Sequence, residues 1–259
     1  MKHRYWIISL LVLCLAGALW ADAGEKAQVR EYRAVAETVF HHDPSAYTQG
    51  LFLLDGVLYE SVGQYGESAI RQLDLASGRV VLNKSLEPQF FGEGACFYGG
   101  HIYQLTWREN VCFVYDRALN MVGQMYVPTE GWGLTTDGTS LILSDGTSTL
   151  YFMDPMTFEA QREVTVTKAG KKVPYLNELE YIDGKVWANV YGTDYVVIID
   201  PQDGHVEATV DCAGLLPSRY AGAVDVLNGI AYDRQSDKVY LTGKLWPELY
   251  EISLVEKAQ

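Results

Sequence analysis

The sequence is poor in basic residues and has only one long apolar run. Twenty Lys and Arg stand against 33 Asp and Glu, which gives a formal net charge of −13. A surface this acidic repels phosphate backbones and anionic lipids, so neither nucleic acid nor a membrane surface is expected as a partner. The apolar run lies at the N-terminus, and no later stretch offers the ~20 apolar residues of a membrane-spanning helix.

The chain also lacks the nucleophile-elbow, HExxH and P-loop patterns, so serine hydrolase, zinc protease and nucleotide-binding functions have no support. No residues have metal-ligand spacing, and we predict no metal and no cofactor. Beyond Cys14 the chain has an odd number of cysteines, Cys96, Cys112 and Cys212. Cys96 and Cys112 are expected two strands apart, about twice the 4.8 Å strand spacing, which is too far for a disulfide. We therefore predict buried free thiols.

The N-terminal residues have the composition of a secretory signal peptide. A basic segment at 2–4 precedes an apolar run at 5–20 and a small-residue cleavage site at 21–23. The predicted organisation is a signal peptide at 1–23 and a single mature domain at 24–259, periplasmic or secreted. An uncleaved anchor is the alternative. Lipidation at Cys14 is not expected, because Leu13 stands where a small residue is needed.

Five segments, spaced by roughly 45 residues, share one pattern. Each opens with a polar or glycine motif, enters an apolar strand, turns, and returns through a second strand. The segments begin at Thr48-Gln49-Gly50-Leu51, Gly92-Glu93-Gly94-Ala95, Gly131-Trp132-Gly133-Leu134, Asn177-Glu178-Leu179-Glu180 and Asn228-Gly229-Ile230-Ala231. The turns are Asp55-Gly56, Gly99-Gly100, Asp137-Gly138, Asp183-Gly184 and Ser236-Asp237. Asp-Gly and Gly-Gly pairs favour two-residue hairpins because they tolerate positive φ.

Four short antiparallel strands in each repeat are typical of propeller blades. The last repeat is one strand short, and the apolar segment from Val29 to Phe40 can supply the missing strand. We predict an all-β, five-bladed β-propeller closed by its N-terminal strand. A six-bladed ring with a degenerate blade and a β-sandwich are the alternatives.

Hairpin geometry sorts the residues of each blade onto two faces, because the start of the first strand and the end of the second lie together. The turn face collects Asp-Gly pairs and little else. The opposite face collects Gln49, Glu93, Trp132, Asn177, Glu178 and Asn228 from strand starts, and Glu60, Trp107, Asp145, Trp187, Asn189 and Lys244 from strand ends. We predict the site at this second face.

These residues also have ordinary structural interpretations. The tryptophans can pack in the core or between blades, and Lys244 can neutralise a carboxylate. Glu60, Glu178 and Glu180 can form ion pairs, Glu60 with Arg71.

Seven strings in order extend the pattern over the mature chain. They are Tyr47-Thr48-Gln49-Gly50-Leu51, Tyr59-Glu60-Ser61, Phe91-Gly92-Glu93-Gly94, Gln104-Leu105-Thr106-Trp107, Gly131-Trp132-Gly133-Leu134, Leu176-Asn177-Glu178-Leu179-Glu180 and Thr242-Gly243-Lys244-Leu245-Trp246-Pro247. Together they resemble the plant and bacterial glutaminyl cyclases, which are five-bladed propellers of the glutamine cyclotransferase family. The resemblance implies a metal-independent enzyme that converts the N-terminal glutamine of peptides or proteins to pyroglutamate and releases ammonia.

The resemblance also implies site residues. The family's essential glutamate falls on Glu93, its supporting amide on Asn177 and its lysine on Lys244. The expected substrate-binding residues are Gln49, Glu60, Trp107, Trp132 and Trp187. Tyr47 is a departure from the family's usual aromatic residue before the glutamine.

The chemistry suits these residues. An α-amine has a pKa of about 7.7 to 8, so a base must take its proton before or during attack. Glu93, flanked by Phe90 and Phe91, is expected to be desolvated with a raised pKa, so that it can return the proton to the departing nitrogen. Lys244 and Asn177 can donate to the oxyanion.

Two other functions stay open, a calcium-dependent lactonase-like hydrolase and a non-catalytic propeller that binds peptides. Chelator sensitivity would favour the first, and saturable binding without ammonia release the second. A monomer is expected.

Overall fold

The computed structural model describes residues 28–258, whose regular structure is almost entirely β-strand, with one short 3₁₀ helix, η1 (Ser218–Tyr220). The prediction of an all-β fold is confirmed. The predicted signal peptide at 1–23, including Cys14, lies outside the described residues. Within residues 28–258 no helix has the length and apolarity needed to cross a membrane.

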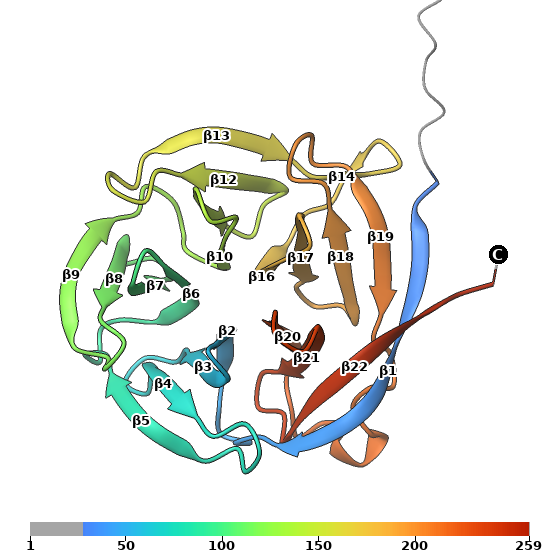
Figure 1. The fold of residues 1–259 in the computed structure, drawn as a ribbon, viewed down its shortest axis with the longest axis horizontal. Helices are drawn as coiled ribbons and strands as arrows, with labels where there is room; N and C mark the ends of the chain where they lie inside the picture. The colour runs from blue at the N-terminus through green and yellow to red at the C-terminus, as the bar shows by residue number, and fades with distance from the viewer. Residues whose placement is uncertain (1–27, 259) are drawn as a thin grey trace, which may run out of the picture.

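The strands form a propeller-like ring of sheets around a central axis (Figure 1). Three antiparallel sheets have four strands each, and their strands follow chain order from the axis to the perimeter. They contain β2 (Thr48–Leu54), β3 (Val57–Val62), β4 (Ala69–Leu73) and β5 (Val80–Ser85); β6 (Gly92–Tyr98), β7 (His101–Thr106), β8 (Val111–Tyr115) and β9 (Met121–Tyr126); and β10 (Leu134–Thr136), β11 (Leu141–Ser144), β12 (Thr149–Met153) and β13 (Ala160–Thr165).

An eight-stranded sheet completes the ring, and a separate small hairpin forms a two-stranded sheet. The strand order of the eight-stranded sheet is β16-β17-β18-β19-β1-β22-β21-β20. The bounds are β16 (Leu176–Ile182), β17 (Lys185–Val190), β18 (Tyr195–Ile199), β19 (Val206–Asp211), β1 (Arg30–His41), β22 (Glu248–Glu256), β21 (Lys238–Gly243) and β20 (Leu227–Asp233), with the hairpin formed by β14 (Thr167–Lys168) and β15 (Lys171–Lys172). β1 pairs antiparallel with β22 and parallel with β19, so the predicted N-terminal strand lies beside the last strand of the chain.

The hairpin turns between first and second strands carry the expected residues. Asp55–Gly56 has φ values of 52° and 79°, and Asp183–Gly184 has 47° and 80°. Both are two-residue loops closed by a strand pair on either side, as the Asp-Gly pairs predict. The loops at 137–140 and 234–237 are two residues longer than predicted. After the first loop pairing resumes two residues late, at Leu141, and before the second it stops two residues early, at Asp233.

Burial falls from the axis to the perimeter. The first five residues of the inner strand β2 are buried, whereas five of the six residues of the outer strand β5 are exposed. Apolar side chains pack between neighbouring sheets; Leu105 and Leu134, for example, share one cluster with Cys96 and Cys112. The three described cysteines are buried and free, as predicted.

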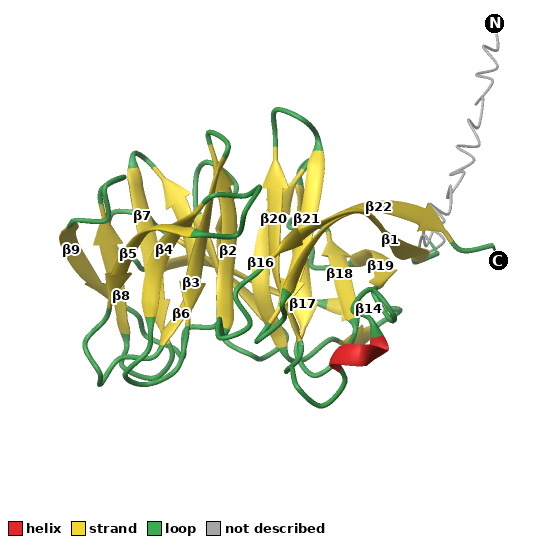
Figure 2. Cartoon of the chain, turned by 90° about the horizontal axis from the view of Figure 1, so that it is seen from below, coloured by secondary structure: helices red, strands yellow, loops and turns green. Residues whose placement is uncertain are grey.

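Strand-start glycines let the inner strands meet at the axis. A Cβ on Gly50 would lie 2.5 Å from the backbone nitrogen of Ala95, and one on Gly133 would lie 1.9 Å from the carbonyl oxygen of Asn177. Only glycine permits this approach. The strands run between the two faces of the ring (Figure 2), so close packing at the axis brings the first residues of several strands to one mouth.

Candidate active site

The mouth at the strand starts holds a pocket of about 340 Å³. Its walls come from the starts of the inner strands and from residues that directly follow the second strands. The lining residues are Tyr47, Gln49, Gln64, Phe91, Glu93, Trp107, Trp132, Asn177, Tyr191 and Lys244. Six of the eight predicted site residues are among them, all except Glu60 and Trp187.

Two positions of the repeat supply most of the pocket. The first lies at or beside the start of the inner strand and is occupied by Gln49, Glu93, Trp132, Asn177 and Asn228. The second directly follows the second strand and is occupied by Gly63, Trp107, Asp145, Tyr191 and Lys244. A repeated backbone position thus presents chemically different side chains to one cavity.

Glu93, on β6, is the buried carboxylate of this pocket, with 4% exposure. Gln49 Nε2 donates to Glu93 Oε1 at 2.9 Å, and Asn228 Nδ2 donates to Gln49 Oε1 at 3.3 Å. Burial raises the pKa of Glu93 well above its usual value, and the nearby Lys244 opposes this shift. The direction agrees with the expectation from its aromatic and glycine neighbours. Glu93 is therefore suited to hold and return a proton near neutral pH.

Lys244 faces aromatic rings inside the pocket. Its side chain is buried, and Nζ lies 4.6 Å from the ring centre of Tyr47 and 5.1 Å from that of Tyr191. Burial lowers the pKa of Lys244, while the charges of Glu93 and Asp225 oppose the shift. A desolvated ammonium with a lowered pKa is a strong hydrogen-bond donor to developing negative charge.

Three asparagines at this mouth keep unused hydrogen-bonding capacity. Asn177 and Asn228 each have a buried Oδ1 without a partner among the described residues, and Asn189 has a buried Nδ2 without one. Asn189 Oδ1 accepts from the backbone N–H of Gly229 at 3.0 Å, which fixes the orientation of its amide. Unpaired buried amides are costly and mark places where water or substrate polar groups bind. Asn177 alone of the three lines the pocket.

A carboxylate that was not predicted, Glu130, holds the two pocket indoles. Glu130 Oε2 accepts from Trp107 Nε1 at 2.9 Å and from Trp132 Nε1 at 3.1 Å, and Oε1 accepts from Arg108 Nε at 2.9 Å. The Arg108 guanidinium also lies 3.7 Å from the Trp107 ring centre. Glu130 thereby fixes the relative orientation of the indoles. The sequence signal was its place directly before the Gly131-Trp132-Gly133 string.

Comparison with known proteins identifies the family to which the chain belongs. The family model for glutamine cyclotransferase matches residues 9–254. The chain belongs to the glutamine cyclotransferase family. It is 44% identical over 234 residues to a glutaminyl-peptide cyclotransferase of Arabidopsis thaliana, covering 88% of this chain and 72% of that protein.

A solved structure of the same kind is also similar. The crystal structure of the Myxococcus xanthus glutaminyl cyclase superposes with a TM-score of 0.84 at 33% identity, covering 89% of this chain and all of that one. The resemblance inferred from the seven strings is confirmed by these findings.

Trp187, predicted to bind substrate, is not among the residues that line the pocket of this glutamine cyclotransferase family member. It is the third residue of β17 and packs in the core with Val196, Ile198 and Trp246. β17 runs from the turn face towards the pocket, so Trp187 lies three residues, at about 3.3 Å each, before the pocket end of the strand at Val190. Tyr191 occupies the pocket position instead, edge-to-face with Trp132 at 5.7 Å.

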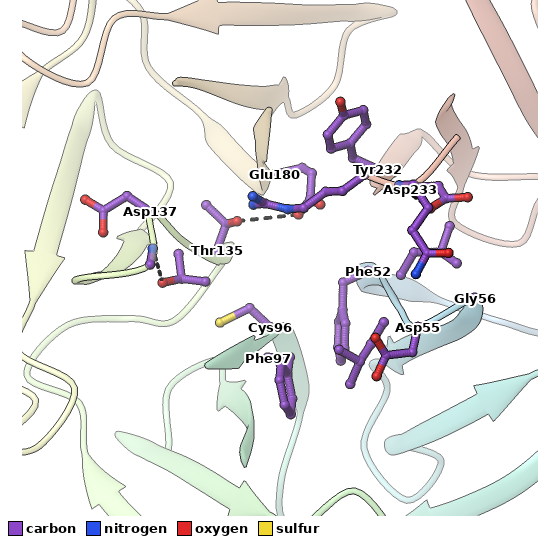
Figure 3. A pocket seen from close by; sticks show the side chains of 16 residues that line it. Phe52, Asp55, Gly56, Cys96, Phe97, Thr135, Asp137, Glu180, Tyr232 and Asp233 are labelled. Atoms are coloured by element: carbon purple, nitrogen blue, oxygen red, sulfur yellow. Dashed lines mark hydrogen bonds between the residues drawn. The ribbon is translucent and has the colours of Figure 1, made fainter. Parts of the chain in front are cut away.

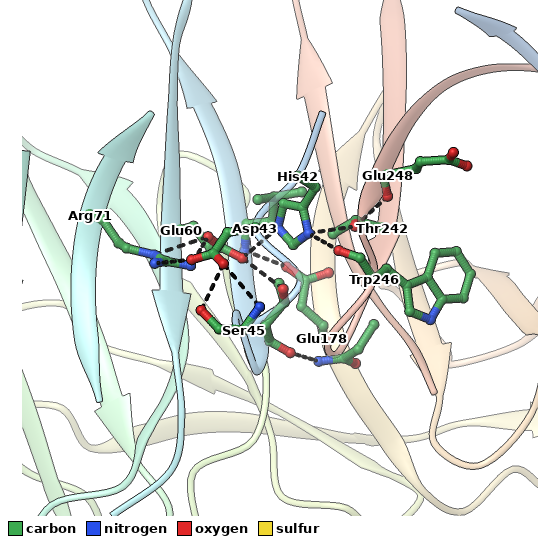
Figure 4. Close-up of polar contacts among 12 residues, drawn as sticks. His42, Asp43, Ser45, Glu60, Arg71, Glu178, Thr242, Trp246 and Glu248 are labelled. Atoms are coloured by element: carbon green, nitrogen blue, oxygen red, sulfur yellow. Dashed lines mark hydrogen bonds and ion pairs between the residues drawn. The ribbon is translucent and has the colours of Figure 1, made fainter. Parts of the chain in front are cut away.

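Glu60, also predicted to bind substrate, is not among the residues that line the pocket. It is fully buried below the mouth, where it pairs with Arg71 at 2.9 Å and with His42 Nε2 at 2.9 Å and accepts from Thr48 Oγ1 at 2.7 Å (Figure 4). Burial would raise the pKa of Glu60, but His42 and Arg71 lower it to about 2. The alternative interpretation, an ion pair with Arg71, is confirmed.

Glu178, on β16, is a buried carboxylate that bonds to the inner strands β2 and β20. It occupies the position where four repeats have glycine, and its oxygens accept the backbone N–H groups of Leu51 at 3.2 Å and Ile230 at 2.8 Å. Burial raises the pKa of Glu178 well above its usual value, with the nearby charge of Glu180 adding to the shift. The predicted ion-pair alternative does not apply to Glu178, since both bonds are to backbone donors.

The turn face carries more than turn residues, contrary to expectation. It holds a second cavity of about 320 Å³ whose wall includes Glu180, Tyr232 and Arg234 (Figure 3). Burial raises the pKa of Glu180 to about 8, against the nearby positive charge of Arg234. Among residues 28–258, no group of three or more His, Cys, Asp or Glu side chains is placed to hold a metal ion.

Proposed function

We propose that this protein cyclises the N-terminal glutamine of peptides at the pocket around Glu93, releasing pyroglutamyl peptide and ammonia. The observation that carries the proposal is the joint presence in one cavity of a buried carboxylate of raised pKa, a buried lysine and two fixed indoles. Membership of the glutamine cyclotransferase family supports the same reaction.

The pocket suits a folded glutamine side chain. Intramolecular attack needs the conformer in which the α-nitrogen approaches Cδ, and selecting it removes most of the entropic cost. Trp107 and Trp132, held by Glu130, give rigid apolar walls for the side-chain methylenes. Asn177 and Gln49 offer amides that can orient the substrate carboxamide and amine.

The proposed reaction moves one proton from the α-nitrogen to the side-chain nitrogen by way of Glu93. The α-nitrogen forms a bond to Cδ, and Glu93 takes the proton that the nitrogen loses. Lys244 and Asn177 donate to the oxygen of the tetrahedral intermediate. The bond from Cδ to the side-chain nitrogen then breaks, and Glu93 returns the proton to this nitrogen, which leaves as ammonia. General acid–base transfer of this kind contributes about 10²- to 10⁴-fold.

We further propose that the reaction needs no metal, since Lys244 supplies the positive charge at the oxyanion. The test measures ammonia release from a Gln-initiated peptide, with and without a chelator. Release that resists chelator in the wild type and in Glu87→Gln, an exposed control, but is lost in Glu93→Gln would support the proposal. Loss of release with chelator would favour a calcium-dependent hydrolase, and saturable binding without release a binding protein.

We also propose a five-bladed propeller closed by the N-terminal strand. The pairing of β1 with β22 supports closure, because it adds a fourth strand to β20–β22. Two proposals come from the sequence alone. One is export to the periplasm or medium after cleavage near residue 23, which N-terminal sequencing of the secreted protein tests. The other is a monomer, which sedimentation tests.

A further inference from the structure

Three lysines without carboxylate partners lie on the hairpin of β14 and β15. Within the described residues, no ion pair or side-chain hydrogen bond involves Lys168, Lys171 or Lys172. Lys185 and Lys238, by contrast, each bind carboxylates at 2.7 to 3.0 Å. The chain has a net charge of −13, so these three lysines form a positively charged site on a negatively charged protein.

The hairpin is a defined element. Ala169 and Gly170 form its two-residue turn with φ values of 49° and 80°. The backbone N–H of Thr167 donates to Gly204 O at 2.9 Å, and that of Val173 donates to Val166 O at 3.0 Å. The lysines are therefore carried by a backbone that is fixed at both ends.

A groove of about 470 Å³ runs beside these lysines. Its apolar part contains Val173, Pro174, Tyr175 and Val190, and Tyr175 is 56% exposed. An exposed aromatic beside lysines suits an extended peptide, whose methylene and backbone groups pack on the ring while acidic side chains meet the ammonium groups.

The groove adjoins the catalytic pocket. Tyr191 lines both cavities, and its backbone N–H donates to Tyr175 O at 2.8 Å. The backbone N–H of Tyr175 in turn donates to Gly146 O, and Gly146 packs against the ring of Trp132. The rest of a substrate whose first residue occupies the pocket has to leave through the mouth, and the groove lies on the other side of Tyr191 from the pocket.

We propose that this groove binds the residues that follow the N-terminal glutamine and selects substrates with acidic side chains there. The inference rests on the proposed function, since it needs glutamine in the pocket. The negative net charge of the whole protein would by itself favour basic peptides. A preference for acidic peptides would therefore have to come from the three lysines of the hairpin.

The experiment compares kcat/KM for alanine-based peptides that begin with Gln and carry one Asp or one Lys at each of positions 3 to 6. At low salt we expect Asp to exceed Lys by about three- to tenfold at one or more positions, from surface ion pairs. About 0.5 M salt should remove most of the difference, because screening shortens the range of such pairs.

Variants of the three lysines then test whether they cause the preference for Asp peptides. In K168E/K171E/K172E the preference should reverse, and in K168Q/K171Q/K172Q, which is milder towards folding, it should vanish. The control K84E changes a lysine on β5, in a different sheet, that has no ion pair among residues 28–258, and should keep the wild-type preference. Equal kcat/KM for Asp and Lys peptides at all positions, or a preference that survives both triple variants, overturns the proposal. Failure of the wild type to cyclise the uncharged parent peptide would instead overturn the proposed function.

Discussion

Replacing Glu60 by Gln distinguishes a structural ion pair from a substrate contact. The side chain of Glu60 is fully buried, and Arg71 and His42 both bind it at 2.9 Å. His42 also contacts the carbonyl oxygen of Trp246 through Nδ1, so the cluster fastens the end of β1 to β3 and to the segment before β22. Gln keeps the volume but removes the charge, leaving the Arg71 guanidinium buried without its main partner.

The expected magnitude follows from that geometry. Breaking a buried ion pair by removing one partner costs about 3 to 5 kcal/mol, and the isosteric amide places Glu60→Gln near 3. In a domain of this size that corresponds to a fall of roughly 6 to 12 °C in the unfolding temperature. Asp43→Asn is the matched control, because Asp43 also binds Arg71 but its side chain is 29% exposed. It should cost about 1 kcal/mol or less.

The pH dependence gives a second measurement of the same cluster. Burial opposes protonation of His42, but the charge of Glu60 outweighs it and raises the pKa of His42. The stability contributed by His42 is therefore full below its unfolded pKa of about 6.5 and is lost as pH rises through the raised value. The contribution of Glu60 is full above its unfolded pKa and is lost as pH falls towards about 2.

The assay is thermal unfolding together with kcat/KM measured well below the transition. We expect Glu60→Gln to lose stability, most clearly near pH 6, and to retain kcat/KM for Gln peptides. An unchanged unfolding temperature with a large loss of kcat/KM would refute the structural argument and return Glu60 to the substrate site.

Three further outcomes are expected from the pocket. Glu130→Gln weakens the acceptor of both indole N–H groups and should raise KM about three- to tenfold with little change in kcat, measured by steady-state kinetics. Gly146→Ala should lower kcat/KM, since its Cβ would lie 2.6 Å from the Trp132 ring, and loss of indole burial is read by fluorescence. Lys244→Met removes the cation that holds down the pKa of Glu93, so the acidic limb of the pH profile should move to higher pH while kcat falls about 10²- to 10³-fold.

The strands and hairpins could be predicted from the sequence because the signals for their turns lie in adjacent residues. Asp-Gly pairs dictate positive φ, and the strand-start glycines mark close packing at the axis, so both signals sit in two or three adjacent residues. The loop at 137–140 was misjudged because the Asp137-Gly138 signal does not say where strand pairing stops.

Position in the repeat predicts which residues line the pocket better than residue type does. Trp107 and Tyr191 both directly follow a second strand, so counting from the Asp183–Gly184 turn identifies Tyr191. Choosing Trp187 for its indole ignored the length of β17. For Glu60 the sequence offered both a substrate contact and an ion pair with Arg71, and the structure shows the ion pair. Its other partner, His42, could not be predicted, because only the folded chain brings the two residues together.

The chemistry of this site depends on broken symmetry in a symmetric fold. Five repeats present the same backbone position to one mouth, yet it holds a carboxylate only at Glu93 and an indole only at Trp132. The next position is glycine in four repeats and Glu178 in the fifth, where the carboxylate bonds to two backbone N–H groups across the axis. Glycine there would leave those N–H groups without this acceptor. We therefore expect Glu178, which is buried and is not among the residues that line the pocket, to help keep water away from the inner end of the pocket near Glu93.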